Sequence, residues 1–292
     1  MTSDKPFAQM PPAPHPSGIT MPQGACDSHV HMVAGPEFPL WDGRVENPAP
    51  GPDFDGWLDK YRSHIAALGC DRGVIVHSIL YGTDNRVTVE AVRRLGPGFK
   101  GVGLLPDDAT DAQLDEFANA GIKALRLNYV HGGVLSWAGA QALAPRLRHR
   151  GLHIQMLLHS HKHMAELADD IRQMDVPLVI DHIGWPDLKL GVDDPGFQTL
   201  LSLLADGHIY VKLSALYRLC PPPYDQADGF VAALMAANPE HLLWGSDWPH
   251  LMLADAQMPA GGAVMDTFLR TIPNPRDRDQ ILVHTPAKLF EF

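Results

Sequence analysis

The sequence is poor in cysteine, in long apolar runs and in positive charge, and each shortage excludes a class of protein. Three cysteines stand far apart among 292 residues, so neither a disulfide framework nor a CxxC metal pair is expected. No apolar run approaches the roughly 18 residues of a transmembrane helix. Lys and Arg number 23 against 34 Asp and Glu, a formal net charge of −11, whereas a nucleic-acid-binding surface is basic. We therefore expect no membrane and no nucleic-acid partner.

The N-terminal segment "MTSDKPFAQMPPAPHPSGITMPQG" is rich in proline. It lacks the charged-then-apolar order of a signal peptide, so a cytoplasmic location is expected. We expect residues 1–22 to form an extended arm, ordered only if it packs against the body of the protein or against another subunit of a homo-oligomer. Residues 23–292 are expected to form one domain, because α/β barrels often exceed 200 residues as a single unit.

Short β-branched runs alternate with longer amphipathic segments along the whole chain. The candidate strands are residues 24–31, 71–78, 99–105, 121–128, 152–159, 177–184, 209–215 and 241–248. Strands alternating with helices indicate a parallel sheet, and the count of eight favours a closed (β/α)8 TIM barrel over an open, doubly wound sheet. No glycine-rich phosphate loop follows the first strand, so a nucleotide site is not expected.

Polar side chains gather at the carboxyl ends of the candidate strands, where a (β/α)8 barrel has its active site. His29 and His31 end the first strand, and their i, i+2 spacing places both on the same face. His182 from the sixth strand and Asp247 from the eighth could complete a cluster with them. Other polar or aromatic residues at or beyond strand ends are candidates for substrate binding: His77, Arg126, Asn128, Trp185, Tyr217, Arg218 and His250.

Simpler interpretations exist for these residues. The histidines could be hydrogen-bonded core residues, Asp247 could cap a following helix, Arg126 could belong to a buried ion pair, and Arg218 could be an exposed loop charge. Two aspartates, Asp27 and Asp181, are expected to be partners that orient the histidines. A second HxH pair, His161 and His163, stands at an expected helix start, where i and i+2 do not share a face, so both are interpreted as solvated.

The combination of "DSHVHM", "VIDHIGWPD" and "WGSDWPH" resembles the amidohydrolase superfamily over nearly the whole chain. More narrowly, it resembles the group that contains 2-pyrone-4,6-dicarboxylate lactonases and sugar-acid lactone enzymes. The resemblance implies a distorted (β/α)8 barrel. It also assigns the catalytic roles to His29, His31, His182 and Asp247.

Many members of the superfamily hold one or two divalent metal ions, and the same four residues are a plausible set for one zinc ion. A binuclear site is not expected, because the fourth strand ends in "ALRLN" without a bridging lysine or carboxylate. The resemblance to the pyrone-lactonase group implies catalysis without a cofactor. The histidines would then stabilise the oxyanion of the lactone carbonyl, and Asp247 would act as the general base.

Two cationic positions of the pyrone lactonases are missing here, and Trp185 stands at one of them. We therefore expect a sugar-acid lactone, with one carboxylate held by Arg126 or Arg218. The resemblance is closest to enzymes that isomerise galactaro-1,5-lactone to the 1,4-lactone, with a substrate hydroxyl as nucleophile in place of water. Hydrolysis of a sugar-acid or dicarboxylate lactone is the alternative. A zinc-dependent decarboxylase or hydrolase and a non-catalytic lactone-binding protein are further alternatives.

Overall fold

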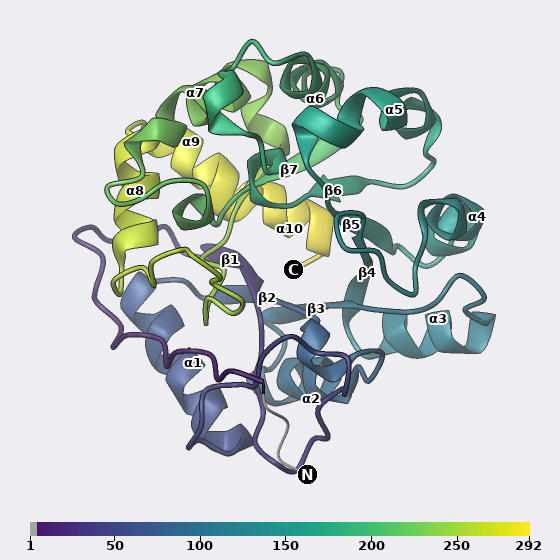
Figure 1. The fold of residues 1–292 in the computed structure, drawn as a ribbon, viewed down its shortest axis with the longest axis vertical. Helices are drawn as coiled ribbons and strands as arrows, with labels where there is room; N and C mark the ends of the chain where they lie inside the picture. Colours follow the sequence, from purple (N-terminus) through teal and green to yellow (C-terminus); the bar gives the residue numbers. More distant parts are fainter. Residues whose placement is uncertain (1–4) are drawn as a thin grey trace.

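A computed structural model describes residues 5–292. Its core is one sheet of eight parallel strands, hydrogen-bonded in sequence order from β1 to β8. A bridge between Val30 and Trp248 brings the last strand's end back to the first, so the barrel is nearly closed (Figure 1). The strands are β1 Cys26–Val30, β2 Arg72–Val76, β3 Phe99–Gly103, β4 Ile122–Asn128, β5 His153–Leu157, β6 Leu178–Ile180, β7 Ile209–Leu213 and β8 Leu242–Trp244. The expected (β/α)8 barrel is confirmed.

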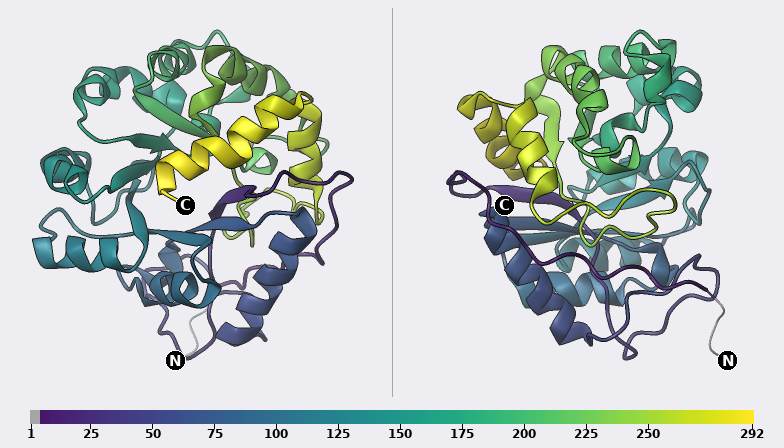
Figure 2. Two further views of the ribbon diagram at one scale, coloured as in Figure 1. Left: turned by 180° about the vertical axis from the view of Figure 1, so that it is seen from behind. Right: turned by 60° about the vertical axis from the view of Figure 1, so that its left-hand side comes forward.

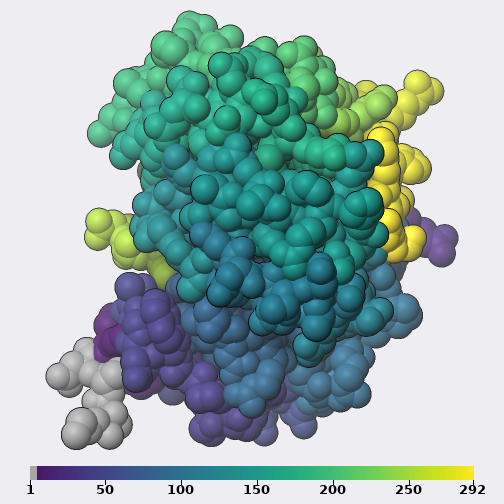
Figure 3. Space-filling model, turned by 90° about the vertical axis from the view of Figure 1, so that its right-hand side faces the viewer, coloured from purple at the N-terminus to yellow at the C-terminus, as the bar shows by residue number. Residues whose placement is uncertain are grey.

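Helices surround the strands as an outer ring (Figures 1 and 2). They are α1 Phe54–Leu68, α2 Arg86–Leu95, α3 Asp111–Asn119, α4 Trp137–Arg148, α5 Ser160–Gln173, α6 Pro195–Ala205, α7 Asp228–Ala237, α8 Ala263–Thr271, α9 Pro275–Asp279 and α10 Thr285–Phe290. Short turns are η1 Ile79–Tyr81, η2 His182–Gly184, η3 Leu188–Leu190, η4 Leu216–Arg218, η5 Asp225–Ala227, η6 Pro239–His241 and η7 Gln280–His284. Figure 3 shows the closely packed face formed by α3, α4 and α5, in blue to teal. None of the helices described is long and apolar enough to cross a membrane.

Local sequence explains where these helices begin and end. Asp53 caps α1 by accepting a hydrogen bond from the N–H of Gly56, which satisfies one of the free donors of the first turn. The same helix ends at Gly69, whose φ of 75° is in the left-handed region that glycine adopts without strain. Thr110 and Gln113 form a reciprocal capping box at the start of α3.

The C-terminal helix closes the barrel at the end opposite to the strands' carboxyl ends. Leu289 and Phe290 of α10 pack against inward-facing residues near the start of the strands, such as Cys26 and Val74. In the left view of Figure 2, this yellow helix lies across that end. Apolar side chains fill the barrel at the amino ends of the strands. Ligands therefore reach the carboxyl ends of the strands from the opposite face.

The proline-rich arm packs against the barrel instead of projecting from it. Ala8 donates a backbone hydrogen bond to Asn47, and Ser17 donates one to Ala67 at the end of α1. Figure 2 shows the purple arm running past α1. Packing against the body was the condition under which we expected the arm to be ordered, and the arm meets it. Residues 1–4 of the expected arm lie outside the described residues.

Candidate active site

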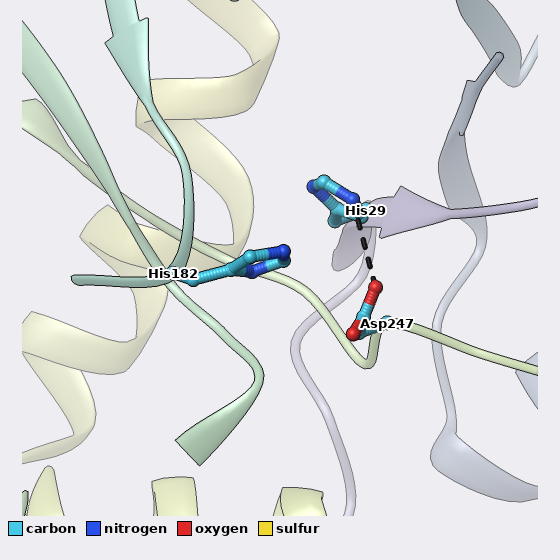
Figure 4. Close-up of side chains that lie close together, drawn as sticks. All are labelled: His29, His182 and Asp247. Carbon is cyan, nitrogen blue, oxygen red and sulfur yellow. Dashed lines mark ion pairs between the residues drawn. The ribbon is translucent and has the colours of Figure 1, made fainter. Parts of the chain in front are cut away.

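The fold brings His29, His182 and Asp247 together at the carboxyl ends of β1, β6 and β8, as Figure 4 shows. All three side chains are buried. One imidazole nitrogen of each histidine and one carboxylate oxygen of Asp247 lie within 4.8 Å of one another. His29 Nε2 lies 3.6 Å from Asp247 Oδ1. The juxtaposition predicted from the strand ends is therefore present in the structure.

The two carboxylate oxygens of Asp247 have different surroundings. Oδ2 accepts hydrogen bonds from the hydroxyl of Tyr217 at 2.6 Å and from Nε of Arg218 at 3.0 Å. Oδ1 faces His29 and His31, whose Nε2 atoms are 3.6 and 3.5 Å away, and among the described residues it has no hydrogen-bond partner. One oxygen is thus fixed by the protein, and the other is available to a ligand.

The charge of Asp247 is stabilised by its neighbours. Burial alone would raise the pKa of this carboxyl, but the nearby guanidinium of Arg218 and, to a smaller extent, the adjacent ring of His182 hold the pKa well below its usual range. Burial would likewise lower the pKa of Arg218, but Asp247 raises it above the usual value. The carboxylate is therefore ionised at neutral pH and partly neutralised by the guanidinium.

Strained backbone holds these groups in place. Asp247 has a φ of 61°, His182 has a φ of 56°, and Trp185 has a φ of 38°, a region that residues with a Cβ rarely adopt. No helix follows Asp247 directly, since α8 begins at Ala263, so the carboxylate does not act as a helix cap. Strain of this kind persists where the surroundings impose it, and it is concentrated at functional sites.

The other two histidines each have a hydrogen-bond partner at Nδ1, and that of His31 fixes the position of a proton. His31 Nδ1 lies 2.9 Å from the carbonyl oxygen of Val76, which can only accept, so this nitrogen carries a proton. On a neutral ring, His31 Nε2 is then an acceptor facing Asp247. His182 Nδ1 lies 2.8 Å from the Ser214 hydroxyl, and burial lowers the pKa of His182 to about 4.

Beneath His29 lies a buried polar group that includes a lysine. Asp181 Oδ1 is 3.2 Å from His29 Nδ1, so this aspartate lies against the histidine that it was expected to orient. Lys212 Nζ lies 3.3 Å from the same nitrogen and 2.6 Å from Gln155 Oε1. Burial lowers the pKa of Lys212 to about 8, although the negative charge of Asp181 raises it. Sequence reasoning missed Lys212, although a lysine inside the apolar strand "IYVKL" was a usable signal.

Asp27, the other aspartate expected to orient a histidine, mainly joins the first strand to the last. It accepts hydrogen bonds from the N–H and the hydroxyl of Ser246, at 2.8 and 2.5 Å. Its contact with the backbone N–H of His29 is longer, at 3.3 Å. Burial raises the pKa of Asp27 to about 6, although these hydrogen bonds lower it.

Arg126, Asn128 and Trp185 lie farther out. Arg126 Nη1 donates to the carbonyl of His77 at 2.6 Å, while its buried Nε has no hydrogen-bond partner in the part of the chain that is described. The ring of Trp185 contacts that of His182, with centroids 5.7 Å apart. Asn128 is half-buried, and its side chain accepts from the N–H of His131. Arg126 therefore keeps donors for an anionic ligand.

Other residues expected to bind substrate are engaged by the protein itself. Arg218 uses its remaining donors on the carbonyls of Leu251 and Met252, at 2.7 and 3.0 Å, and Tyr217 donates to Asp247. His77 Nε2 lies 2.7 Å from the carbonyl of Gly82. Through these contacts the three residues support the site and its loops.

Two further expectations about histidines can be compared with the structure. His250 is buried against the Tyr217 ring, with centroids 5.1 Å apart. The interpretation of His161 and His163 as solvated is wrong, because both are half-buried. His163 Nδ1 accepts from the N–H of His159 at 3.1 Å and so stabilises the start of α5, while His161 Nδ1 accepts from the N–H of Asp187 at 3.2 Å.

The geometry of the three clustered residues fits one divalent metal ion. His29 and His182 offer imidazole nitrogens and Asp247 offers a carboxylate oxygen, a ligand set that zinc accepts. His29 Nε2 and Asp247 Oδ1 are buried atoms without hydrogen-bond partners within residues 5–292. His31, the fourth member of the expected zinc set, is outside this group. Such an ion would share Asp247 with the positive charge of Arg218.

Comparison with known proteins gives matches along almost the whole chain. The family model described as Amidohydrolase matches residues 26–292. A 4-sulfomuconolactone hydrolase from Hydrogenophaga intermedia is 32% identical, covering 94% of this chain and 91% of its own. A D-galactarolactone isomerase from Agrobacterium fabrum is 25% identical, covering 96% and 94%. A solved structure from Pseudomonas putida, assigned as a 2-pyrone-4,6-dicarboxylic acid hydrolase, is 28% identical with a TM-score of 0.78, covering 93% and 98%.

Proposed function

The chain belongs to the amidohydrolase family, and we propose that within this family it hydrolyses a lactone that carries an anionic group. The expected resemblance to amidohydrolases acting on lactones is confirmed by its relatives, which are lactone hydrolases or isomerases. One observation carries the proposal. The unpartnered Oδ1 of Asp247 faces His29 Nε2 at 3.6 Å, so a base and a possible oxyanion donor stand side by side, where one substrate carbonyl can approach both.

Binding places the substrate between these groups. The free donors of Arg126 bind the anionic group, since a guanidinium binds carboxylates and sulfonates through paired hydrogen bonds. The lactone carbonyl oxygen then lies near Nε2 of His29 and of His182. These nitrogens stabilise the negative charge that develops on that oxygen. Trp185, packed beside His182, offers an apolar face to the ring.

Proton transfer passes through Asp247. Oδ1 accepts a proton from water as the water oxygen bonds to the carbonyl carbon. His31 Nε2, an acceptor on the neutral ring, lies 3.5 Å from the same oxygen and can share this proton. Collapse of the tetrahedral intermediate breaks the bond between the acyl carbon and the ring oxygen, which takes the proton back. The product is an open-chain hydroxy acid.

Catalysis in this proposal needs no metal ion. Arg218 already neutralises Asp247, and the end of β4 offers Arg126 where a bridging ligand would stand. If zinc were held by His29, His182 and Asp247, it would polarise the lactone carbonyl. The residues assigned above would still bind the anionic group and position the substrate.

Isomerisation is the second candidate, and the similarity to the D-galactarolactone isomerase over 96% of this chain favours it. A hydroxyl of the substrate then takes the place of water, and every other step uses the same residues. Sequence reasoning placed isomerisation of galactaro-1,5-lactone first. We put hydrolysis first in this proposal, and the higher identity to a hydrolase, 32% against 25%, supports that order.

One experiment separates these possibilities. The purified protein is treated with a strong chelator and given 4-sulfomuconolactone or galactaro-1,5-lactone in oxygen-18 water, with products followed by NMR and mass spectrometry. A labelled open-chain acid is the expected result. An unlabelled 1,4-lactone would establish isomerisation, and activity only after zinc is restored would establish a metal enzyme. Saturable binding without turnover would establish a lactone-binding protein and end the proposal.

A further inference from the structure

Lys212 is fully buried in the barrel, directly beneath the catalytic histidine of β1. Its Nζ has acceptors on several sides: the backbone carbonyl of Ser28 at 2.8 Å, Gln155 Oε1 at 2.6 Å and His29 Nδ1 at 3.3 Å. Asp181 Oδ1 is slightly farther, at 3.7 Å. A buried ammonium is costly unless its protons are used, so its placement calls for an explanation.

Counting the protons of Lys212 favours one tautomer of His29. An ammonium has three N–H donors, and two of them are used by Ser28 and Gln155. The nearest acceptor for the third is His29 Nδ1, provided that this nitrogen carries a lone pair. A neutral imidazole has one protonated nitrogen, so the proton of His29 is then on Nε2, the atom that faces Asp247.

Asp181 is the competing partner for the same nitrogen. It lies 3.2 Å from Nδ1 and would stabilise the opposite tautomer if Nδ1 donated to it, as carboxylates do behind metal-bound histidines. However, Asp181 Oδ1 accepts no hydrogen bond from any described residue, and its Oδ2 accepts from Gln155. Asp181 thus forms an ion-pair contact with His29, whereas Lys212 Nζ, 3.3 Å from Nδ1, is a group that can only donate to this nitrogen.

We propose that Lys212 is a positioning residue that selects the Nε2–H tautomer of His29, and so makes this histidine a donor to the lactone oxyanion. The proposal rests on the proposed lactone chemistry. The opposite tautomer would direct a lone pair of Nε2 at Asp247 and at the developing negative charge, which opposes the reaction. The same lone pair is what a metal ion would need, so Lys212 also disfavours metal binding.

Nitrogen-15 NMR of histidine-labelled protein tests the tautomer directly. The His29 signals are identified by comparison with the His29→Gln spectrum. In the wild type, we expect a protonated Nε2 and an unprotonated Nδ1. In Lys212→Met, which removes the donor at similar length, we expect the proton to move to Nδ1, where Asp181 accepts it. A protonated Nδ1 in the wild type would overturn the proposal even if the variant failed to fold.

Kinetics provides the second readout. Loss of one oxyanion donor lowers kcat by about 100-fold or more, so Lys212→Met should lower kcat by about that factor with little change in KM. Lys100→Met is the matched control, since Lys100 lies on β3 near Phe292 at the closed end of the barrel. An unchanged kcat in a folded Lys212→Met variant would contradict the proposal.

The NMR measurement uses no substrate, so the two proposals can fail separately. If His29 is protonated on Nε2 and no lactone is turned over, the proposed function fails while the tautomer assignment stands. If lactones are turned over and Nδ1 carries the proton, only the role of Lys212 is refuted.

Discussion

Arg218 holds Asp247 through two contacts to one oxygen, because its Nε and a terminal guanidinium nitrogen both lie 3.0 Å from Oδ2. The guanidinium is itself fixed by the carbonyls of Leu251 and Met252. The other oxygen of Asp247 is left free for chemistry. Arg218 thus orients the carboxylate of Asp247, the proposed base, and keeps it ionised.

Replacing Arg218 by Met should move the acid limb of the pH–rate profile to higher pH. The base acts only when ionised, and Arg218 holds the pKa of Asp247 well below its usual range. Without that charge the pKa rises, so activity is lost at a higher pH as the medium is acidified. The measurement is kcat/KM between pH 4 and 8. Arg86→Met, which alters an exposed arginine, should leave the profile unchanged.

The same substitution leaves a buried carboxylate without its cation, which typically costs about 3–5 kcal/mol. The free energy of unfolding of Arg218→Met, measured by urea titration at pH 7, should fall by about that amount. A stable variant with an unshifted acid limb would show that Arg218 does not set the ionisation of Asp247.

Replacing Asp247 by Asn should lower kcat by about 100- to 10,000-fold, the usual contribution of a general base. The amide keeps the size of the side chain but cannot accept the proton of the nucleophile. Initial rates of lactone opening at pH 7 measure the effect. Asp255→Asn, in the exposed part of the loop that follows β8, is the control. Retained activity in Asp247→Asn would assign the base elsewhere, with His31 as the next residue to test.

The barrel and the cluster of His29, His182 and Asp247 could be predicted from the sequence alone, because the pattern of strands and helices determines where the strand ends lie. Eight strand-like runs alternating with helices permit few folds, and a (β/α)8 barrel brings all strand ends to one face. His29, His182 and Asp247 then had to converge, although Asp247 is more than 200 residues away from His29 in the chain.

Contacts made by loops and by flexible side chains could not be predicted in this way. Arg218 follows a turn that begins at Ala215 with a φ of 56°, and nothing in the residue types shows that its guanidinium turns towards Asp247 and not towards a substrate. Lys212 was missed because one lysine in an apolar strand is more often an edge or surface residue. Its role depends on four partners from three other segments: Ser28 and His29 on β1, Gln155 on β5, and Asp181 after β6.

Replacing Arg126 by Met should weaken the binding of anionic lactones. Hydrogen bonds to a charged group contribute about 1.5–3 kcal/mol, so KM should rise by about 10- to 100-fold while kcat changes less. An uncharged lactone of the same ring size should show nearly the same KM with both proteins. Equal losses for charged and uncharged substrates would show that Arg126 acts on the structure and not on an anionic group.

Acidification should destabilise the protein through its buried histidines. Burial lowers the pKa of His64 to about 4 and that of His153 to about 3, from 6.5. The unfolded chain therefore binds protons below pH 6.5 that the folded chain cannot bind until pH 4 or lower. Stability is then greatest above pH 6.5 and is lost as the pH falls through this window.

His64 offers the clearest test, because its Nε2 has no hydrogen-bond partner among the described residues and its ring stacks on Trp248. His64→Phe keeps an aromatic ring and removes one titrating group, which is worth about 1.4 kcal/mol per pH unit. Between pH 6.5 and 5, the variant should lose about 1.5 kcal/mol less unfolding free energy than the wild type, measured by urea titration with circular dichroism. His149→Gln, at an exposed position, should follow the wild type. If His64→Phe also follows the wild type, His64 is protonated in the folded state, and burial does not keep it neutral.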